Sequence, residues 1–188
     1  MIESLANRIS LYYVRNNMVK EDDREVISYM LFLIFSNVQQ ILAFIAVAFI
    51  FNAFPQTIAF AVFFAVLKNQ AGGAHSNKHW VCFVVTTSLA FIVCLLSTMF
   101  TFPTFVPIIA SMIMLLIVVL KAPIIHPNNP KTPRRQKIMR RNSIFIAISQ
   151  CFLIAIFTLF LPILALPSAL GSLTSASTLL FPVPENES

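Results

Sequence analysis

Charge is scarce in this sequence. Only 11% of its 188 residues are Asp, Glu, Lys or Arg, whereas 58% are hydrophobic. Soluble proteins carry about 25% charged residues. The composition therefore excludes an ordinary soluble domain and indicates an integral membrane protein.

Cysteine and glycine are also few, with three of each. Three cysteines give no disulfide framework, and Cys82 and Cys94 lie about 18 Å apart along a straight helix. The net charge of +6 does not indicate nucleic acid, because basic residues do not alternate with base-stacking aromatics; the 19 phenylalanines lie in apolar blocks. We therefore expect no nucleic-acid partner and attribute the charge to lipid contact and membrane topology.

Three blocks of the chain contain no charged residue. They are residues 26–67, 79–120 and 142–184. Each is about twice the roughly 20 residues that cross a bilayer as a helix. Each also contains helix breakers near its middle: Asn52 with Pro55, Pro103 with Pro107, and Pro162 with Pro167. We therefore predict an all-α membrane protein of about six transmembrane helices, arranged as three hairpins. The sixth segment, after Pro167, is rich in Ser and Thr; a full crossing, a re-entrant segment and an interfacial segment all remain open for it.

The basic residues predict the orientation in the membrane. All 13 Lys and Arg lie before the first block or in the two connections between blocks, and none lies near the breakers. Connections rich in Lys and Arg stay in the cytoplasm. We therefore expect a multi-pass membrane protein with both termini and both connections on the cytoplasmic side.

Residues 1–25 precede the first block and carry an apolar stripe. Ile2, Leu5, Ile9 and Tyr12 recur at helical spacing, with polar residues between them. This pattern predicts an amphipathic helix on the membrane surface. A frayed polar N-terminus is the alternative.

Residues 68–82, KNQAGGAHSNKHWVC, contain the groups best suited to chemistry. A thiolate is a good nucleophile, and an imidazole can take the thiol proton and later give it to a leaving amine. Gly72 and Gly73 allow backbone N–H groups to approach a carbonyl closely, as an oxyanion site requires. His75 and Cys82 thus supply the two groups of a cysteine-dependent acyl transfer.

The spacing of these residues leaves alternatives open. His75 and Cys82 lie about 10.5 Å apart along a straight helix, so their contact requires a bend, whereas His79 is one helical turn from Cys82. The three residues also form part of a metal-binding pattern, but no fourth Cys, Asp or Glu lies nearby. We therefore expect no metal and no cofactor. A membrane-boundary segment without chemistry, with Trp80 as an interfacial anchor, is the remaining alternative.

The motif GGAHSNKHWVC, placed between two predicted crossings, resembles the accessory gene regulator B (AgrB) family, the membrane endopeptidases that process quorum-sensing propeptides. The resemblance covers almost the whole chain, including the basic connection that opens with KAP and continues through PRRQKIMRR. It implies that His75 and Cys82 are the catalytic pair, and it assigns no role to His79. Lys68 and Asn69 stand where the family commonly has two arginines.

The resemblance also implies a location in the bacterial cell membrane, and it implies a reaction. Residues 1–188 would form one peptidase domain, with a catalytic connection over 68–82 and a basic cytoplasmic loop over 121–141. Cys82 would attack a membrane-associated propeptide, and a Cys or Ser of that peptide would resolve the thioester into a thiolactone or lactone ring. The candidate substrate-binding residues are Lys68, Gly72, Gly73, Lys131, Arg134 and Arg135. The basic connection also suits anionic lipids, and the sequence leaves a homodimer open.

The second class of function is a small transporter or scaffold without covalent chemistry, peptide export included. Ion-coupled carriers contain ionisable residues within their crossings. The three blocks contain no Asp, Glu, Lys or Arg, so we favour the peptidase. Cys94 and Cys151 lie within predicted crossings, and we interpret both as packing residues.

Overall fold

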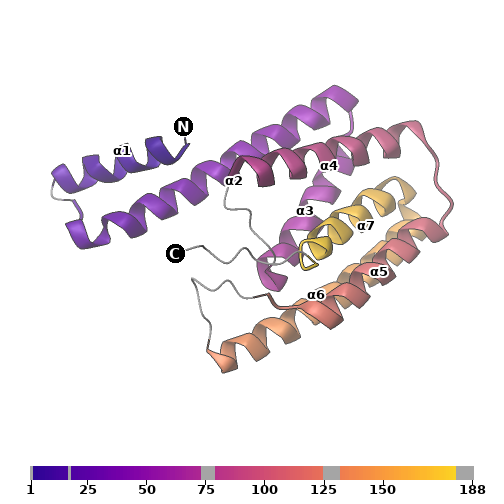
Figure 1. Ribbon diagram of the computed structural model, residues 1–188. Coiled ribbons are helices and arrows are strands. Elements are labelled where there is room, and N and C mark those ends of the chain that lie inside the picture. The colour runs from indigo at the N-terminus through magenta and orange to yellow at the C-terminus, as the bar shows by residue number, and fades with distance from the viewer. Residues whose placement is uncertain (1, 17, 73–78, 125–131, 181–188) are drawn as a thin grey trace. The chain divides into compact units, whose positions relative to one another are not determined.

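A computed structural model describes residues 2–16, 18–72, 79–124 and 132–180. The chain divides into two compact units, Met1–Ala43 and Phe44–Ser188, and the described residues are almost entirely helical (Figure 1). The helices are α1 (Ile2–Arg15), a short 3₁₀ turn (Glu21–Asp23), α2 (Arg24–Phe51), α3 (Phe54–Ala71), α4 (His79–Met99), α5 (Phe105–Lys121), α6 (Pro133–Phe160) and α7 (Pro162–Ser177).

Each charge-free block is interrupted near its predicted breaker. Asn52, which has a left-handed φ of 48°, separates α2 from α3. Residues 100–104 separate α4 from α5, and Leu161 separates α6 from α7. Pro162 lies in the first turn of α7, where a missing N–H costs no intrahelical hydrogen bond.

The prediction for Pro167 as a breaker was wrong, because it lies inside α7 and is buried. A proline inside a helix leaves one backbone carbonyl without its hydrogen-bond donor. A membrane helix tolerates this when neighbouring groups supply a partner for that carbonyl. Within the described residues, three helical stretches are long and apolar enough to cross a membrane, Glu21–Phe51, Trp80–Met99 and Pro133–Phe160, and α5 is a shorter apolar helix.

The first unit contains α1 and the beginning of α2, which lie side by side (Figure 1). Ala6 and Ser10 of α1 are buried, and the Ser28 hydroxyl of α2 donates to Asn7 Oδ1 of α1 at 2.8 Å. Leu5 and Tyr12 remain exposed. The predicted helix is present, and its position on a membrane surface stays a prediction.

In the second unit, α7 packs against α3, α4, α5 and α6. More than half of α7 is buried, and most of its buried residues are Ala, Ser or Gly. A Cβ added at Gly171 would lie 2.5 Å from the Phe60 carbonyl oxygen, so the backbones of α7 and α3 touch. Small residues are what close helix contact in a membrane requires. The segment with the weakest hydrophobic signal is therefore the enclosed helix of this unit.

A buried amide connects three of these helices. Gln150 of α6 donates from Nε2 to the Phe63 carbonyl oxygen of α3 at 2.9 Å. The Ser172 hydroxyl of α7 donates to Gln150 Oε1, also at 2.9 Å. Because a buried amide must find partners, these bonds specify which faces of α3, α6 and α7 meet.

The outside of the second unit is apolar over much of its length. The exposed large side chains of α5 include Ile109, Met112, Leu116 and Leu120, and Phe152 of α6 is also exposed. A soluble monomer rarely exposes so large an apolar surface, whereas hydrocarbon accommodates it at no cost. A lipid bilayer is therefore the environment expected around the second unit.

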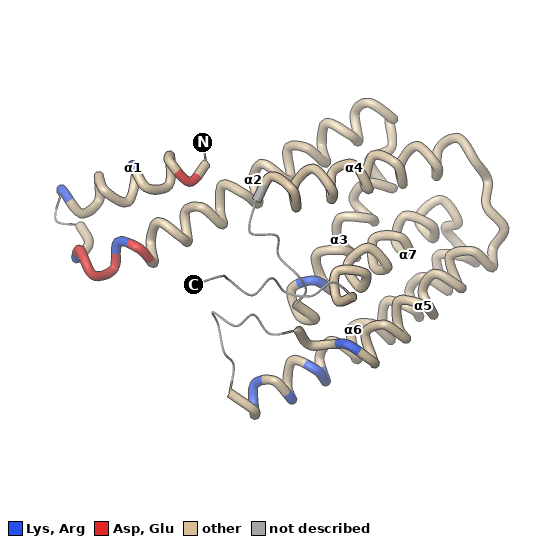
Figure 2. Tube along the Cα trace, viewed as in Figure 1, with Lys and Arg blue, Asp and Glu red and all other residues tan. Residues whose placement is uncertain are grey.

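The basic residues of the second unit gather at one end (Figure 2). They lie at the end of α3, at the end of α5 and along the start of α6. The basic connection was predicted over residues 121–141. Residues 133–141 of this range are helical and belong to α6. Thr132 caps α6 by accepting a hydrogen bond from the Arg135 N–H at 3.4 Å.

Candidate active site

The described part of the predicted site lies on three helices of the second unit. Lys68 is in the last turn of α3, Cys82 is in the first turn of α4, and Arg134 and Arg135 open α6. Gly72 follows α3 directly. His75, Gly73 and Lys131 lie outside the described residues, so their predicted roles stay predictions.

Lys68 and Cys82 are brought together across the catalytic connection. The Lys68 ammonium donates to Cys82 Sγ with a separation of 3.9 Å. The ammonium also lies 5.1 Å from the centroid of the Phe64 ring, one helical turn earlier, close enough for a cation–π interaction. Both Lys68 and Cys82 are half-buried. The cation is therefore held against the sulfur from the opposite helix.

The position of Cys82 on α4 also bears on its chemistry. The first turn of a helix carries partial positive charge from its unpaired N–H groups, which favours negative charge that develops nearby. Downstream, the Thr86 hydroxyl donates to the Cys82 carbonyl oxygen at 2.8 Å. The backbone of His79 opens the same helix, one turn before Cys82.

Gly72 joins the two connections at the basic end of this unit. It has φ +74° and ψ −144°, a conformation that is nearly restricted to glycine. It forms a parallel bridge with Ile124, and the Ile124 N–H donates to the Ala71 carbonyl oxygen at 3.2 Å. The catalytic connection and the basic connection therefore leave the helices from adjacent points.

The Gly72 amide does not point at an empty oxyanion site. It donates to the Lys68 carbonyl oxygen at 3.1 Å and so closes the end of α3. What the site uses from Gly72 is its small size, because an added Cβ would lie 2.5 Å from the Ile124 carbonyl oxygen. This approach between residues far apart in the chain has no signal in the sequence beyond the glycine itself.

The other two cysteines are placed differently. Cys94 is fully buried, and its Sγ lies 3.1 Å from the Thr57 hydroxyl. Cys151 is half-buried within α6 and donates to the Ser111 carbonyl oxygen at 3.3 Å. Both sulfurs contact neighbouring helices in the interior of the bundle, as packing residues do.

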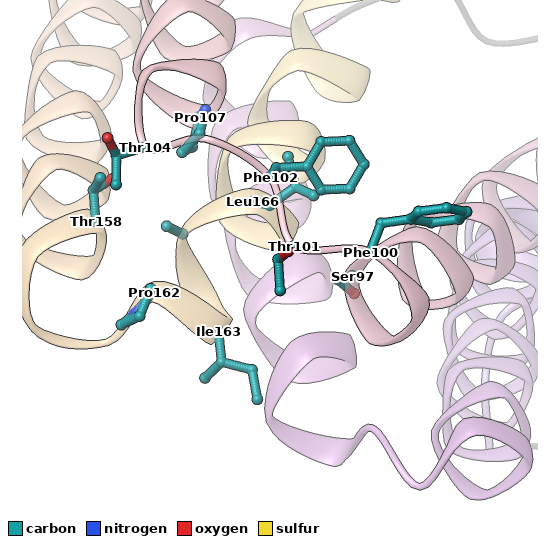
Figure 3. Close-up of a pocket in the computed structure, with 11 residues that line it drawn as sticks. Ser97, Phe100, Thr101, Phe102, Thr104, Pro107, Thr158, Pro162, Ile163 and Leu166 are labelled. Carbon is teal, nitrogen blue, oxygen red and sulfur yellow. The ribbon is translucent and has the colours of Figure 1, made fainter.

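A cavity of about 330 Å³ lies at the opposite end of the second unit (Figure 3). Hydroxyl groups of Ser97, Thr101, Thr104 and Thr158 share its lining with apolar side chains. Ser97 follows Cys82 on α4 by about 22 Å of helix. The cavity therefore does not belong to the candidate active site.

Comparison with known proteins identifies a family. The sequence model of the family described as accessory gene regulator B matches residues 6–180. No curated protein and no solved structure matches the chain. The matched range includes every described helix of the second unit and the whole stretch from Lys68 to Cys82.

Proposed function

The chain belongs to the accessory gene regulator B family, whose members process quorum-sensing propeptides, and we propose that it is a membrane cysteine endopeptidase with Cys82 as its nucleophile. The family match over residues 6–180 carries this proposal. The position of Cys82 supports it, because the half-buried thiol lies in the first turn of α4, beside a cation.

The proposed reaction has two steps. In the first, the Cys82 sulfur attacks the scissile carbonyl, a carbon–sulfur bond forms, and the carbon–nitrogen bond breaks. His75 takes the thiol proton and gives it to the departing amine of the C-terminal fragment. In the second, a Cys or Ser side chain of the bound peptide attacks the thioester carbonyl and gives its proton to His75. The thiolactone or lactone ring closes as the carbon–sulfur bond to Cys82 breaks, which frees Cys82.

Ring closure competes with hydrolysis in the second step. Exchange of one thioester for another is close to neutral in free energy, so closure prevails when water is kept from the acyl-enzyme. Formation of a thioester from an amide is uphill. Removal of the released fragment should therefore help to drive the overall reaction.

The basic residues suit an acidic part of the propeptide. Arg134 and Arg135 lie exposed at the start of α6, and Lys131 precedes them in the sequence. Arginine binds carboxylates in a bidentate geometry. With Lys68, Gly72 and Gly73 near the scissile bond, they form the proposed substrate-binding set, and the same cations also attract anionic lipid.

We propose that all six helices from α2 to α7 cross the bilayer, with both termini and the active site in the cytoplasm. The gathering of Lys and Arg at one end of the second unit supports this orientation. With 16 residues, α7 spans about 24 Å, which is short of the roughly 30 Å hydrocarbon core. Local thinning of the bilayer around a short helix costs only fractions of a kcal/mol per Å.

Trapping the acyl-enzyme tests the nucleophile. A propeptide whose ring-forming residue is changed to Ala should leave a substrate-derived acyl group on Cys82, detectable by mass spectrometry and released by neutral hydroxylamine. The Cys82→Ser protein should neither cleave nor acylate, because a serine hydroxyl is a far weaker nucleophile than a cysteine thiol.

Cys94→Ser and Cys151→Ser are the matched controls. Both should retain cleavage, because each sulfur contacts another helix away from the catalytic connection. Full cleavage by the Cys82→Ser protein, or loss in the two control variants alone, would contradict the proposed nucleophile.

A further inference from the structure

We infer that Lys68 is the charge partner of the Cys82 thiolate and makes Cys82 reactive before any substrate binds. This inference rests on the proposed function. The separation of 3.9 Å between Lys68 Nζ and Cys82 Sγ is its central observation. The two residues belong to different helices, so the fold creates this contact.

Among the described residues of the second unit, the Cys82 sulfur is the natural anionic partner of Lys68. The seven Asp and Glu all lie before position 26 or after position 184. The described residues of the second unit therefore contain no carboxylate side chain that could neutralise a lysine. A half-buried ammonium favours an anion at contact distance, and in the described surroundings of Lys68 the Cys82 sulfur is the group that can become one.

The lysine side chain is also held in place. Its ammonium lies over the ring of Phe64 at 5.1 Å, and Phe64 is itself buried. The Lys68 ammonium therefore contacts both the Cys82 sulfur and the Phe64 ring. This restraint reduces the rotamer entropy that a flexible lysine otherwise loses when it forms an ion pair.

With this pairing, Lys68 and the catalytic imidazole have separate roles. Lys68 stabilises negative charge on sulfur, in the free enzyme and again when ring closure expels the thiolate. The proton taken from Cys82 is then available on the imidazole for the departing amine. A lysine that served substrate binding alone would act only when propeptide is present, and this difference is measurable.

The test measures alkylation of Cys82 without propeptide. In a Cys94→Ser, Cys151→Ser background, the thiolate displaces iodide from iodoacetamide or iodoacetate, and the second-order rate at pH 7 reports its reactivity. Lys68→Met should lower the iodoacetamide rate about tenfold or more, the effect expected for loss of a charge at contact distance. It should lower the rate with anionic iodoacetate further, because the cation also attracts that reagent. Lys68→Arg should restore most of both rates.

Lys137→Met is the matched control, since it removes an equal charge from an exposed position of α6 and should leave both rates unchanged. If Lys68→Met does not accumulate in the membrane, Lys68→Gln replaces it. Unchanged alkylation in the Lys68 variants, with cleavage lost, would overturn the inference and identify Lys68 as a substrate contact. That result would leave the proposed function intact, because the function is tested separately by cleavage in the Cys82→Ser, Cys94→Ser and Cys151→Ser proteins.

Discussion

Two histidines in the catalytic connection, His75 and His79, are candidates for the same role as general base. Helix spacing favours His79, which opens α4 one turn before Cys82, whereas the family register favours His75. We expect His75→Ala to reduce propeptide cleavage by about a hundredfold or more, the usual contribution of a general acid–base group. His79→Ala should reduce it by a much smaller factor.

Cleavage of purified propeptide, followed by mass spectrometry, separates the two histidines. Alkylation of Cys82 by iodoacetamide should remain measurable in both variants, which shows that each protein is folded. Greater loss from His79→Ala than from His75→Ala would mean that the family register does not transfer to this chain.

At Gly72, both the backbone conformation and a close contact with Ile124 require glycine. Its φ of +74° with ψ of −144° costs a non-glycine residue about 1–3 kcal/mol, and an added Cβ would meet the Ile124 carbonyl oxygen. Gly72→Ala should therefore separate the catalytic connection from the basic one and lower cleavage together with the midpoint of thermal unfolding in detergent.

Ile124→Val is the control for Gly72→Ala, because it keeps the Ile124 backbone that forms the bridge. It should behave like the unaltered protein. An active Gly72→Ala protein with an unchanged unfolding midpoint would show that the bridge is dispensable.

At the scale of helices, α7 shows that a segment with a weak apolar signal can form a buried helix. Its small residues weaken the apolar signal of its segment, yet they allow its backbone to approach α3 at Gly171. We expect Gly171→Ala to destabilise the second unit by about 1–3 kcal/mol, the usual cost of overpacking. Thermal unfolding in detergent measures this loss.

Ser177→Thr is the control for Gly171→Ala, because it adds a methyl group at a partly exposed position of the same helix. It should change the unfolding midpoint little. Equal effects of the two substitutions would argue against a close α3–α7 contact.

The helix breaks were predictable because proline, asparagine and local charge act within a few residues. Asn52 and Pro162 lie at or next to breaks, whereas Pro167 does not, because packing around α7 outweighs its local effect. The contact between Lys68 and Cys82 could not be predicted, since it depends on how α3 and α4 pack. The sequence indicated that Lys68 belongs near the site, but not which atom it contacts.

At the scale of the whole molecule, the orientation in the membrane can be tested directly. In a background without Cys82, Cys94 and Cys151, single cysteines at Asn52 and Pro103 should react with an impermeant thiol reagent added outside intact cells. A cysteine at Lys137 should react only after the cells are permeabilised. The opposite labelling pattern would reverse the proposed orientation.

The central position of α7 also bears on how the protein is made. The ribosome produces α7 after α3, α4, α5 and α6, yet α7 contacts all four. Until it arrives, Gln150 lacks its Ser172 partner, and the interior face of the bundle is open to lipid. Insertion of the earlier helices during translation and assembly of the bundle are therefore separate events, and peptidase activity should appear only after the last helix has entered.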